Sequence, residues 1–303
     1  MRKLVESVPN ISEGRDQTVL SKLMASLERI PKVAVLDVHV DPDHHRSVFT
    51  IIGEPKAMEM ALFGLVQQAQ QLINIGQHQG EHPRIGAVDV VPWIPIEGVN
   101  MEDCVRYANE LGARIGQELE IPVFLYEEAG KVPSRVKLEI VRRGGLAALG
   151  RRMKIEHEWR PDYGPPMIHS TAGAIAVGAR FFLIAFNIVL KSDDLAVANN
   201  IAKTIRSSSG GLLALKAMGV SLVSRELVQV SMNLTDYRET SLRQAYTAVS
   251  REAQRYEIEV LESEIVGLIP RAAWDEQLSH DLKLQSMEPD LLIESRLEQS
   301  SMF

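Results

Sequence analysis

Hydrophobic positions along the chain alternate between two spacings, which predicts a regular order of strands and helices. Runs rich in β-branched residues are typical of strands, and runs with apolar side chains three or four positions apart are typical of helices. In the first half we expect, in chain order, a strand at 4–8, a helix from Thr18, strands at 33–40 and 47–52, a helix at 57–73, a strand at 85–93, a helix at 101–118 and a strand at 123–126. The first six elements have the β-α-β-β-α-β order of a split βαβ sandwich.

The same order returns in the second half. After an irregular, charged stretch at 129–160, which we interpret as a helical elaboration plus a loop, the pattern predicts a strand at 180–190, a helix at 193–205, strands at 212–220 and 227–234, a helix at 240–256 and a strand at 259–268. The fold prediction is therefore α/β (α+β), with two ferredoxin-like βαββαβ subdomains, each a mixed sheet covered by helices. The expected subdomains are 1–178 and 179–303, the latter with a helical tail.

Composition narrows the function without naming it. The chain has 303 residues with a net charge of −7, which argues against a general nucleic-acid binder because such proteins carry a basic face. Its single cysteine, Cys104, excludes an internal disulfide and a cysteine-based zinc cluster. The start does not resemble a signal peptide, and no apolar stretch reaches the roughly 18 residues that a membrane span needs. We expect a cytoplasmic protein with no membrane partner.

The first candidate for chemistry is the stretch GEHPRIGAVD at 80–89. It places an acid, an imidazole and a guanidinium immediately before an apolar strand. The proline after His82 favours an extended conformation for that histidine. An imidazole titrates near neutral pH and can both accept and donate a proton. The alternative is a loop histidine hydrogen-bonded to a neighbour.

The second candidate is the stretch DVHVDPDHHR at 37–46. Strand alternation places Asp37, His39 and Asp41 on one face and the intervening valines on the other. A polar pocket, a solvated turn and a metal site are all compatible with this pattern, because histidine and carboxylate side chains crowd into ten residues.

The third candidate is the stretch from Asp162 to Arg180. The small residues between 172 and 178 allow close approach of the backbone to a flat ligand. The Ser170 and Thr171 hydroxyl groups offer donors and acceptors, and Arg180, expected to open the next strand, can meet a carboxylate in bidentate geometry. A tightly packed linker between subdomains is the alternative.

Taken together, these stretches resemble the formiminotransferase family, including the N-terminal half of the vertebrate formiminotransferase-cyclodeaminase. The matching stretches are VESVPNISEGRD at 5–16, VLDVHVDPDHHRSVFTIIG at 35–53, HQGEHPRIGAVDVVPWIPI at 78–96, DYGPP with GAIAVGARFFLIAFNIVL within 162–190, LKAMG at 215–219, QVSMNLTDY at 229–237 and EIVGLIP at 264–270. The resemblance extends from the N-terminus to about residue 275. The chain departs from vertebrate members at His39 and Ala172.

The resemblance implies transfer of a formimino group from N-formimino-L-glutamate to tetrahydrofolate, a step of histidine breakdown, with the folate site in a crevice between the subdomains and a homodimer as the assembly. It implies that His82 is the general acid/base, assisted by a carboxylate for which Asp37 and Asp41 are candidates and Asp37 is preferred. The expected substrate- or folate-binding residues are His39, Arg46, Arg84, Asp162, Tyr163, Gly164, Pro165, Ser170, Thr171 and Arg180. No metal is expected, and tetrahydrofolate is the co-substrate.

Two other functions stay open on the sequence. One is a related folate one-carbon transferase that uses N-formylglutamate or 5-formyltetrahydrofolate. The other is a non-catalytic folate-binding protein with the same fold.

Overall fold

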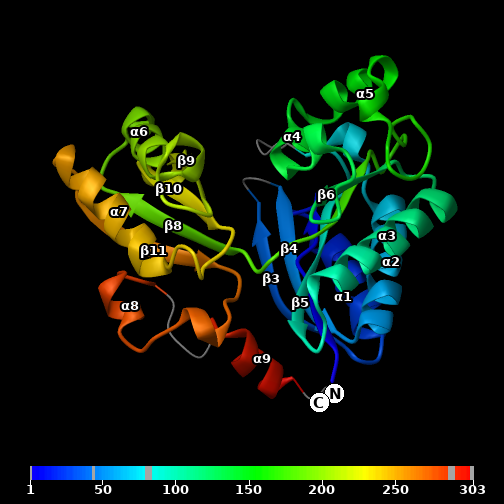
Figure 1. The fold of residues 1–303 in the computed structure, drawn as a ribbon, viewed down its shortest axis with the longest axis horizontal. Coiled ribbons are helices and arrows are strands. Elements are labelled where there is room, and N and C mark those ends of the chain that lie inside the picture. The colour runs from blue at the N-terminus through cyan, green and yellow to red at the C-terminus, as the bar shows by residue number, and fades with distance from the viewer. Residues whose placement is uncertain (1, 43–44, 79–83, 286–290, 301–303) are drawn as a thin grey trace. The chain divides into compact units, whose positions relative to one another are not determined.

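The computed structural model describes residues 2–42, 45–78, 84–285 and 291–300, and the chain divides into two compact units, one ending at Arg180 and the other beginning at Phe181 (Figure 1). Each unit has its own sheet and its own hydrophobic core. Within the described residues, none of the helices is both long and apolar enough to cross a bilayer.

The first unit contains a mainly antiparallel sheet with strands β1 (Leu4–Ser7), β2 (Asn10–Ile11), β3 (Val33–Asp41), β4 (Arg46–Gly53), β5 (Val88–Glu97), β6 (Val123–Glu127) and β7 (Ile175–Ala179). Across the sheet the order is β3-β4-β1/β2-β5-β7-β6, because β1 and β2 both pair with β4 and β5. Strands β5, β1, β4 and β3 have the ferredoxin-like arrangement that the sequence predicts.

Three helices cover one face of this sheet: α1 (Gln17–Glu28), α2 (Pro55–Leu72) and α3 (Met101–Glu118). Their starts follow from local chemistry. The Asp16 side chain accepts the first free N–H groups of α1, Pro55 begins α2, and Asn100 and Asp103 form a capping box on α3. The apolar side chains of these helices pack on one face of the sheet and bury it. Polar side chains of the strands therefore lie on the other face.

The stretch after β6 forms short helices: η2 (Pro133–Arg135), α4 (Leu138–Arg142), α5 (Gly145–Ile155) and η3 (His157–Trp159), while η1 (Ile75–Gln77) follows α2. α4 and α5 pack on the sheet face opposite α1–α3, over β5, β6 and β7, through a separate apolar cluster that includes Val141, Leu149 and Met153. Over β1, β3 and β4 the opposite face instead carries polar side chains beside the apolar Val48 and Ile52.

The sequence pattern predicts neither the two-residue strand β2 nor strand β7. The residues of β7 are two alanines, one glycine, one isoleucine and one valine, a composition that the sequence analysis assigns to close approach of a flat ligand, with the next strand at 180–190. In the structure β7 lies between β5 and β6, parallel to both. Gly178 is required by packing there, since a Cβ atom would lie 2.5 Å from the ring of Tyr126.

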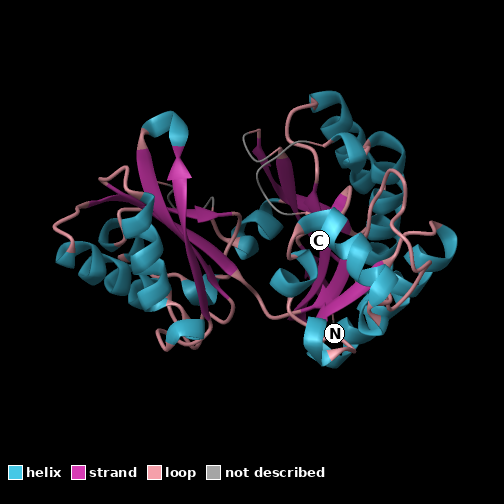
Figure 2. Ribbon diagram, turned by 90° about the horizontal axis from the view of Figure 1, so that it is seen from above, coloured by secondary structure: helices cyan, strands magenta, loops and turns pink. Residues whose placement is uncertain are grey.

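The second unit repeats the βαββαβ order with β8 (Ile184–Leu190), α6 (Leu195–Ile205), β9 (Leu215–Leu222), β10 (Leu227–Leu234), α7 (Leu242–Arg255) and β11 (Val260–Val266). The sheet order is β11-β8-β10-β9, all antiparallel, and the helices lie to one side of the strands (Figure 2). The short elements are η4 (Ser207–Ser209), η5 (Val223–Arg225), η6 (Arg271–Ala273), α8 (Leu278–Asp281) and α9 (Ile293–Gln299). The predicted pair of ferredoxin-like units is confirmed.

Candidate functional site

Three polar side chains of β3 lie on the sheet face opposite α1–α3, as the alternation predicts. Val38 and Val40 pack against the helix-covered core, and Asp37, His39 and Asp41 alternate with them. All three polar residues are half-buried. This face of β1, β3 and β4 is called the polar face below.

Arg46 begins β4 directly opposite Asp41 of β3. Burial lowers the pKa of Arg46, and the positive charge of Arg142 adds to this effect, while Asp41 and Asp89 act against it. Its Nε–H group is buried and has no hydrogen-bond acceptor within the described residues. A buried donor in this state normally costs about 1–3 kcal/mol, which makes Arg46 a candidate to bind an acceptor beyond those that the described residues supply.

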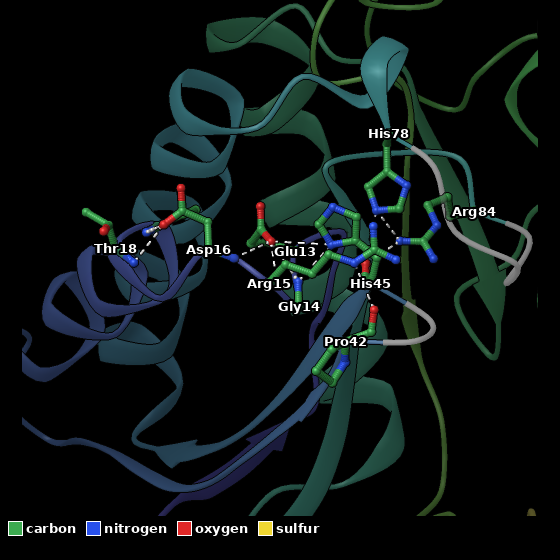
Figure 3. Close-up of polar contacts among 10 residues, drawn as sticks. Glu13, Gly14, Arg15, Asp16, Thr18, Pro42, His45, His78 and Arg84 are labelled. Atoms are coloured by element: carbon green, nitrogen blue, oxygen red, sulfur yellow. Dashed lines mark hydrogen bonds and ion pairs between the residues drawn. The ribbon is translucent and has the colours of Figure 1, made fainter. Parts of the chain in front are cut away.

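The loop before α1 is organised around the Glu13 carboxylate. One oxygen of Glu13 accepts hydrogen bonds from the backbone N–H groups of the next three residues, at 2.9, 2.8 and 2.9 Å (Figure 3). The first of these groups, on Gly14, also donates to Nδ1 of His45 at 3.1 Å. His45 follows the β3–β4 turn with a left-handed backbone (φ 49°), which is uncommon for a residue with a side chain. The Glu13 loop thus fixes the imidazole of the turn.

His45, His78 and Arg84 form one hydrogen-bonded group beside that loop (Figure 3). The two imidazole rings stack with centroids 4.3 Å apart. Arg84 donates from Nη1 to the carbonyl oxygen of His45 at 2.8 Å and lies 2.7 Å from Nε2 of His78. Nε2 of His78 also lies 3.0 Å from the carbonyl oxygen of His45, so this ring nitrogen faces both a donor and an acceptor, and its own role depends on the tautomer.

The pKa values of both histidines are shifted in the same direction. Burial lowers the pKa of His45, although the carboxylate of Glu13 opposes the shift. Burial also lowers the pKa of His78, with the positive charge of Arg84 contributing. Both rings are therefore neutral near pH 7 and can accept hydrogen bonds.

The segment that carries His82 lies outside the described residues, as do Asp43 and His44. Its two ends are described: His78 precedes His82 by four positions, and Arg84 follows it by two. The acid/base role of His82 therefore stays a prediction. Within the residues that the structure places, no three His, Cys, Asp or Glu side chains are grouped so that they could hold a metal ion.

Asp89 and Arg142 are functional candidates that the sequence analysis missed. The Asp89 side chain is 5% exposed; it accepts a hydrogen bond from the backbone N–H of Ile85 at 2.7 Å and forms an ion pair with Arg142 at the end of α4. The positive charges of Arg46 and Arg142 help burial to lower the pKa of Arg84, against the attraction of Asp89. A carboxylate inside a strand expected to be buried was a usable signal for Asp89, but nothing in the irregular stretch pointed to Arg142.

Asp162 is placed in a buried ion pair. Its Oδ2 accepts hydrogen bonds from Arg135 Nη1 at 2.8 Å and from the backbone N–H of Leu125 at 2.7 Å, and the two charged side chains are 4% and 2% exposed. Arg135 also donates to the carbonyl oxygens of Glu158 and Arg160. These contacts join the 158–162 segment to β6, and the predicted contact of Asp162 with folate stays a prediction.

Tyr163 and Gly164 lie against α3 and the segment before β6. The Tyr163 hydroxyl donates to Asn109 at 2.8 Å and accepts from Lys131 at 2.9 Å. Gly164 has φ 82°, and a Cβ atom there would lie 2.5 Å from the carbonyl oxygen of Ile121. Both features place residues 163–164 close to α3 and to the segment that follows it.

The other residues of this segment are more open. Pro165 and Thr171 are half-buried and Ser170 is exposed. The turn they enclose is organised by His169, whose Nδ1 accepts the backbone N–H groups of Thr171 and Ala172 at 3.3 and 3.0 Å. Their predicted roles in folate binding stay predictions.

Arg180 follows β7 and does not open β8, which begins at Ile184. Its backbone N–H donates to the carbonyl oxygen of Trp93 at 3.1 Å. Its charge acts on Glu6 of β1, which alternates with the core residue Val5 and so belongs to the polar face. Burial raises the pKa of Glu6 to about 8 even though Arg180 lowers it.

The structure therefore divides the predicted site residues into groups. Asp37, His39 and Arg46 share the polar face. Arg84 approaches Arg46 and joins the two histidines. Asp162 and Tyr163 are instead engaged by Arg135, Asn109 and Lys131.

Comparison with known proteins identifies the family to which the chain belongs. The fold is that of an α/β protein with two ferredoxin-like units, the first of which carries a polar sheet face with the half-buried Arg46. The model of the formiminotransferase domain, N-terminal subdomain, matches residues 4–180, and the model of the formiminotransferase domain matches residues 185–285. The chain belongs to the formiminotransferase family.

Curated relatives cover nearly the whole chain. A glutamate formimidoyltransferase of Streptococcus pyogenes serotype M1 is 41% identical over 95% of this chain and 96% of its own length. A second, from Thermoplasma acidophilum, is 40% identical over 98% of each chain. The formimidoyltransferase-cyclodeaminase of Rattus norvegicus is 40% identical over 90% of this chain and 51% of its own length.

Proposed function

We propose that the chain is a glutamate formimidoyltransferase that moves the formimino group of N-formimino-L-glutamate to tetrahydrofolate, giving 5-formiminotetrahydrofolate and L-glutamate. The observation that carries this proposal is the near-complete coverage of relatives that bear that name, at 40–41% identity. The assignment of residues 1–178 and 179–303 to its N-terminal and C-terminal subdomains is part of the proposal, as are a homodimeric assembly and a cytoplasmic location.

The reaction requires proton transfer at two nitrogens. The N5 amine of tetrahydrofolate attacks the amidine carbon and must lose a proton, and the departing glutamate nitrogen must gain one. His82 serves both steps as general base and then general acid, a contribution of roughly 10²–10⁴-fold in rate. The described residues on either side of it, His78 and Arg84, are hydrogen-bonded to each other.

Charge complementarity supports the same assignment. The amidine is cationic at neutral pH, so Asp37, with His39 beside it on the polar face, is suited to bind it, and Asp41 is the second candidate. Both substrates carry glutamate carboxylates, for which Arg46, Arg84 and Arg180 are the proposed partners. The buried Nε–H of Arg46, for which the described residues supply no acceptor, is consistent with a carboxylate partner. Pterin recognition is assigned to the stretch from Asp162 to Thr171.

The test is a turnover assay with both substrates that follows the absorbance of the cyclised 5-formimino product. We expect transfer by the unaltered protein, and a loss of roughly 10²-fold or more in kcat for His82→Ala with folate binding retained in calorimetry. His157→Ala is the matched control, because that histidine is exposed on η3. Near-normal turnover by His82→Ala would remove its role.

The same assay separates the alternatives. Preferential use of N-formylglutamate or 5-formyltetrahydrofolate would identify a different one-carbon donor. Tetrahydrofolate binding without turnover of any donor would indicate a non-catalytic binding protein.

A further inference from the structure

Asp89 connects the end of α4 to the chain immediately after Arg84. Its Oδ1 accepts the backbone N–H of Ile85, and its Oδ2 pairs with Nη2 of Arg142. The turn after α4 also lies close to this chain, since a Cβ atom on Gly145 would be 3.8 Å from the Arg84 carbonyl oxygen. The position of Arg142 relative to Arg84 is therefore fixed by covalent and hydrogen-bonded links.

Arg46, Arg84 and Arg142 form what we call the arginine cluster. The first and third also have Nε–H groups that are buried and without an acceptor in the described part of the chain. Each of these two residues has a carboxylate neighbour, Asp41 opposite Arg46 and Asp89 beside Arg142, yet these neighbours leave the Nε–H groups unsatisfied. Within the described residues, these three guanidinium groups act on one another and on the carboxylates of Asp41 and Asp89, and guanidinium groups are suited to bind a carboxylate in bidentate geometry.

We propose that Arg142 completes, with Arg46 and Arg84, a site for the α-carboxylate of the formimino donor. The inference rests on the proposed function. It adds Arg142 to the site and assigns the site to the formimino donor rather than to tetrahydrofolate.

The choice of substrate follows from chain distance and from the chemistry of the donor. Two residues separate Arg84 from His82, and that length of chain spans at most about 7 Å. In the donor, the α-carboxylate is attached to the carbon that carries the reacting nitrogen. In tetrahydrofolate, the p-aminobenzoyl group separates the glutamate carboxylates from N5. A carboxylate site near the His82 loop therefore fits the donor better than the folate tail.

The test substitutes Arg142 with Met, which keeps much of the side-chain length and removes the charge. Donor and tetrahydrofolate are varied separately in steady-state assays, and binding of the product L-glutamate is measured by calorimetry. We expect the KM for the donor and the Kd for glutamate to rise roughly 10- to 100-fold, the loss typical of hydrogen bonds to a charged group. The KM for tetrahydrofolate should stay unchanged. Arg143→Met is the control, because the neighbouring side chain is exposed.

A donor whose α-carboxylate is converted to the amide sharpens the experiment. It should bind poorly to the unaltered protein, and Arg142→Met should weaken it no further, since the two changes remove the same interaction. A rise in the KM for tetrahydrofolate alone would overturn the proposal in favour of the folate tail. Unchanged KM values with a lower melting temperature would overturn it in favour of a purely structural ion pair.

The glutamate titration separates this inference from the proposed function. Weaker glutamate binding in Arg142→Met supports the site even if the protein transfers no formimino group. Formimino transfer with unchanged glutamate binding would leave the function standing and remove the role of Arg142.

Discussion

The two units share the βαββαβ strand order and helix-covered cores, but the faces of their sheets opposite the long helices differ in how their charged side chains are buried. In the first unit this face presents the buried Glu6 and the half-buried Asp37, Asp41 and Arg46. In the second, a row across the strands runs from Ser231 through Asn187 to Glu264, and the charged residues beside it are the exposed Lys216 and the half-buried Glu262. The buried face has to be apolar in both, so topology fixes that half of the sequence. The side chains on the face opposite the long helices can differ between the units, and a functional site can form there.

The two units also differ in how deeply their ion pairs are buried. In the first unit the Arg135–Asp162 pair is almost fully buried. In the second unit, the described pairs such as Arg225–Glu262 keep at least one exposed partner. Buried charges depend on their partners far more than exposed charges do.

The largest expected effect comes from breaking a buried pair. Asp162→Asn should destabilise the first unit by about 3–5 kcal/mol, because it leaves Arg135 buried without its counter-charge. Glu262→Gln, the matched change in the second unit, should cost no more than about 1 kcal/mol. Amide hydrogen exchange, measured separately for the two units, reports both values. Equal losses would show that burial does not separate the two kinds of pair.

A second prediction concerns pH. Because the folded pKa of Glu6 is about 8 and its ordinary value is 4.5, the folded protein holds a proton that the unfolded chain releases between these pH values. Stability therefore falls as pH rises from about 4.5 to 8 and levels off above. Glu6→Gln imitates the neutral form and gives β1 an amide, as Asn187 gives β8.

The stability margin of the variant over the unaltered protein should grow with pH and reach on the order of 4–5 kcal/mol at pH 8, from about 1.4 kcal/mol for each unit between 4.5 and about 8. Thermal melts at pH 5 and pH 8 measure the margin. A margin independent of pH would mean that Arg180 keeps Glu6 ionised in the folded state.

The smallest expected effect is that of a single substitution on the polar face, measured as a change in kcat/KM. Asp37→Asn should lower kcat/KM for the donor roughly 10- to 100-fold, because hydrogen bonds to a charged group contribute about 1.5–3 kcal/mol. Ser231→Ala on the second sheet is the control and should leave kcat/KM within a few-fold. Equal losses in both variants would contradict the assignment of the cationic amidine to the first unit.

The sequence pattern predicted the two βαββαβ orders because strand and helix periods are local properties. It missed β7 because alanine and glycine carry little strand signal, and their placement depends on Tyr126, which is distant in sequence. The same contrast between local patterns and long-range contacts explains which site residues could be predicted. Asp37, His39 and Asp41 could be assigned to one face from alternation, whereas Arg142 reaches Asp89 only through the packing of α4 on the sheet.

The insertion of β7 also sets the order in which the protein can assemble during synthesis. Strands β5 and β6 leave the ribosome well before β7, yet among the described strands β6 pairs with β7 alone. Until residue 179 has been made, both strands present unsatisfied edges, and about fifty residues must be closed into a loop before the parallel pairing forms. A nascent chain that stops short of this strand should therefore be a target for chaperones, whereas β9 and β10 can pair as a local hairpin as soon as they emerge.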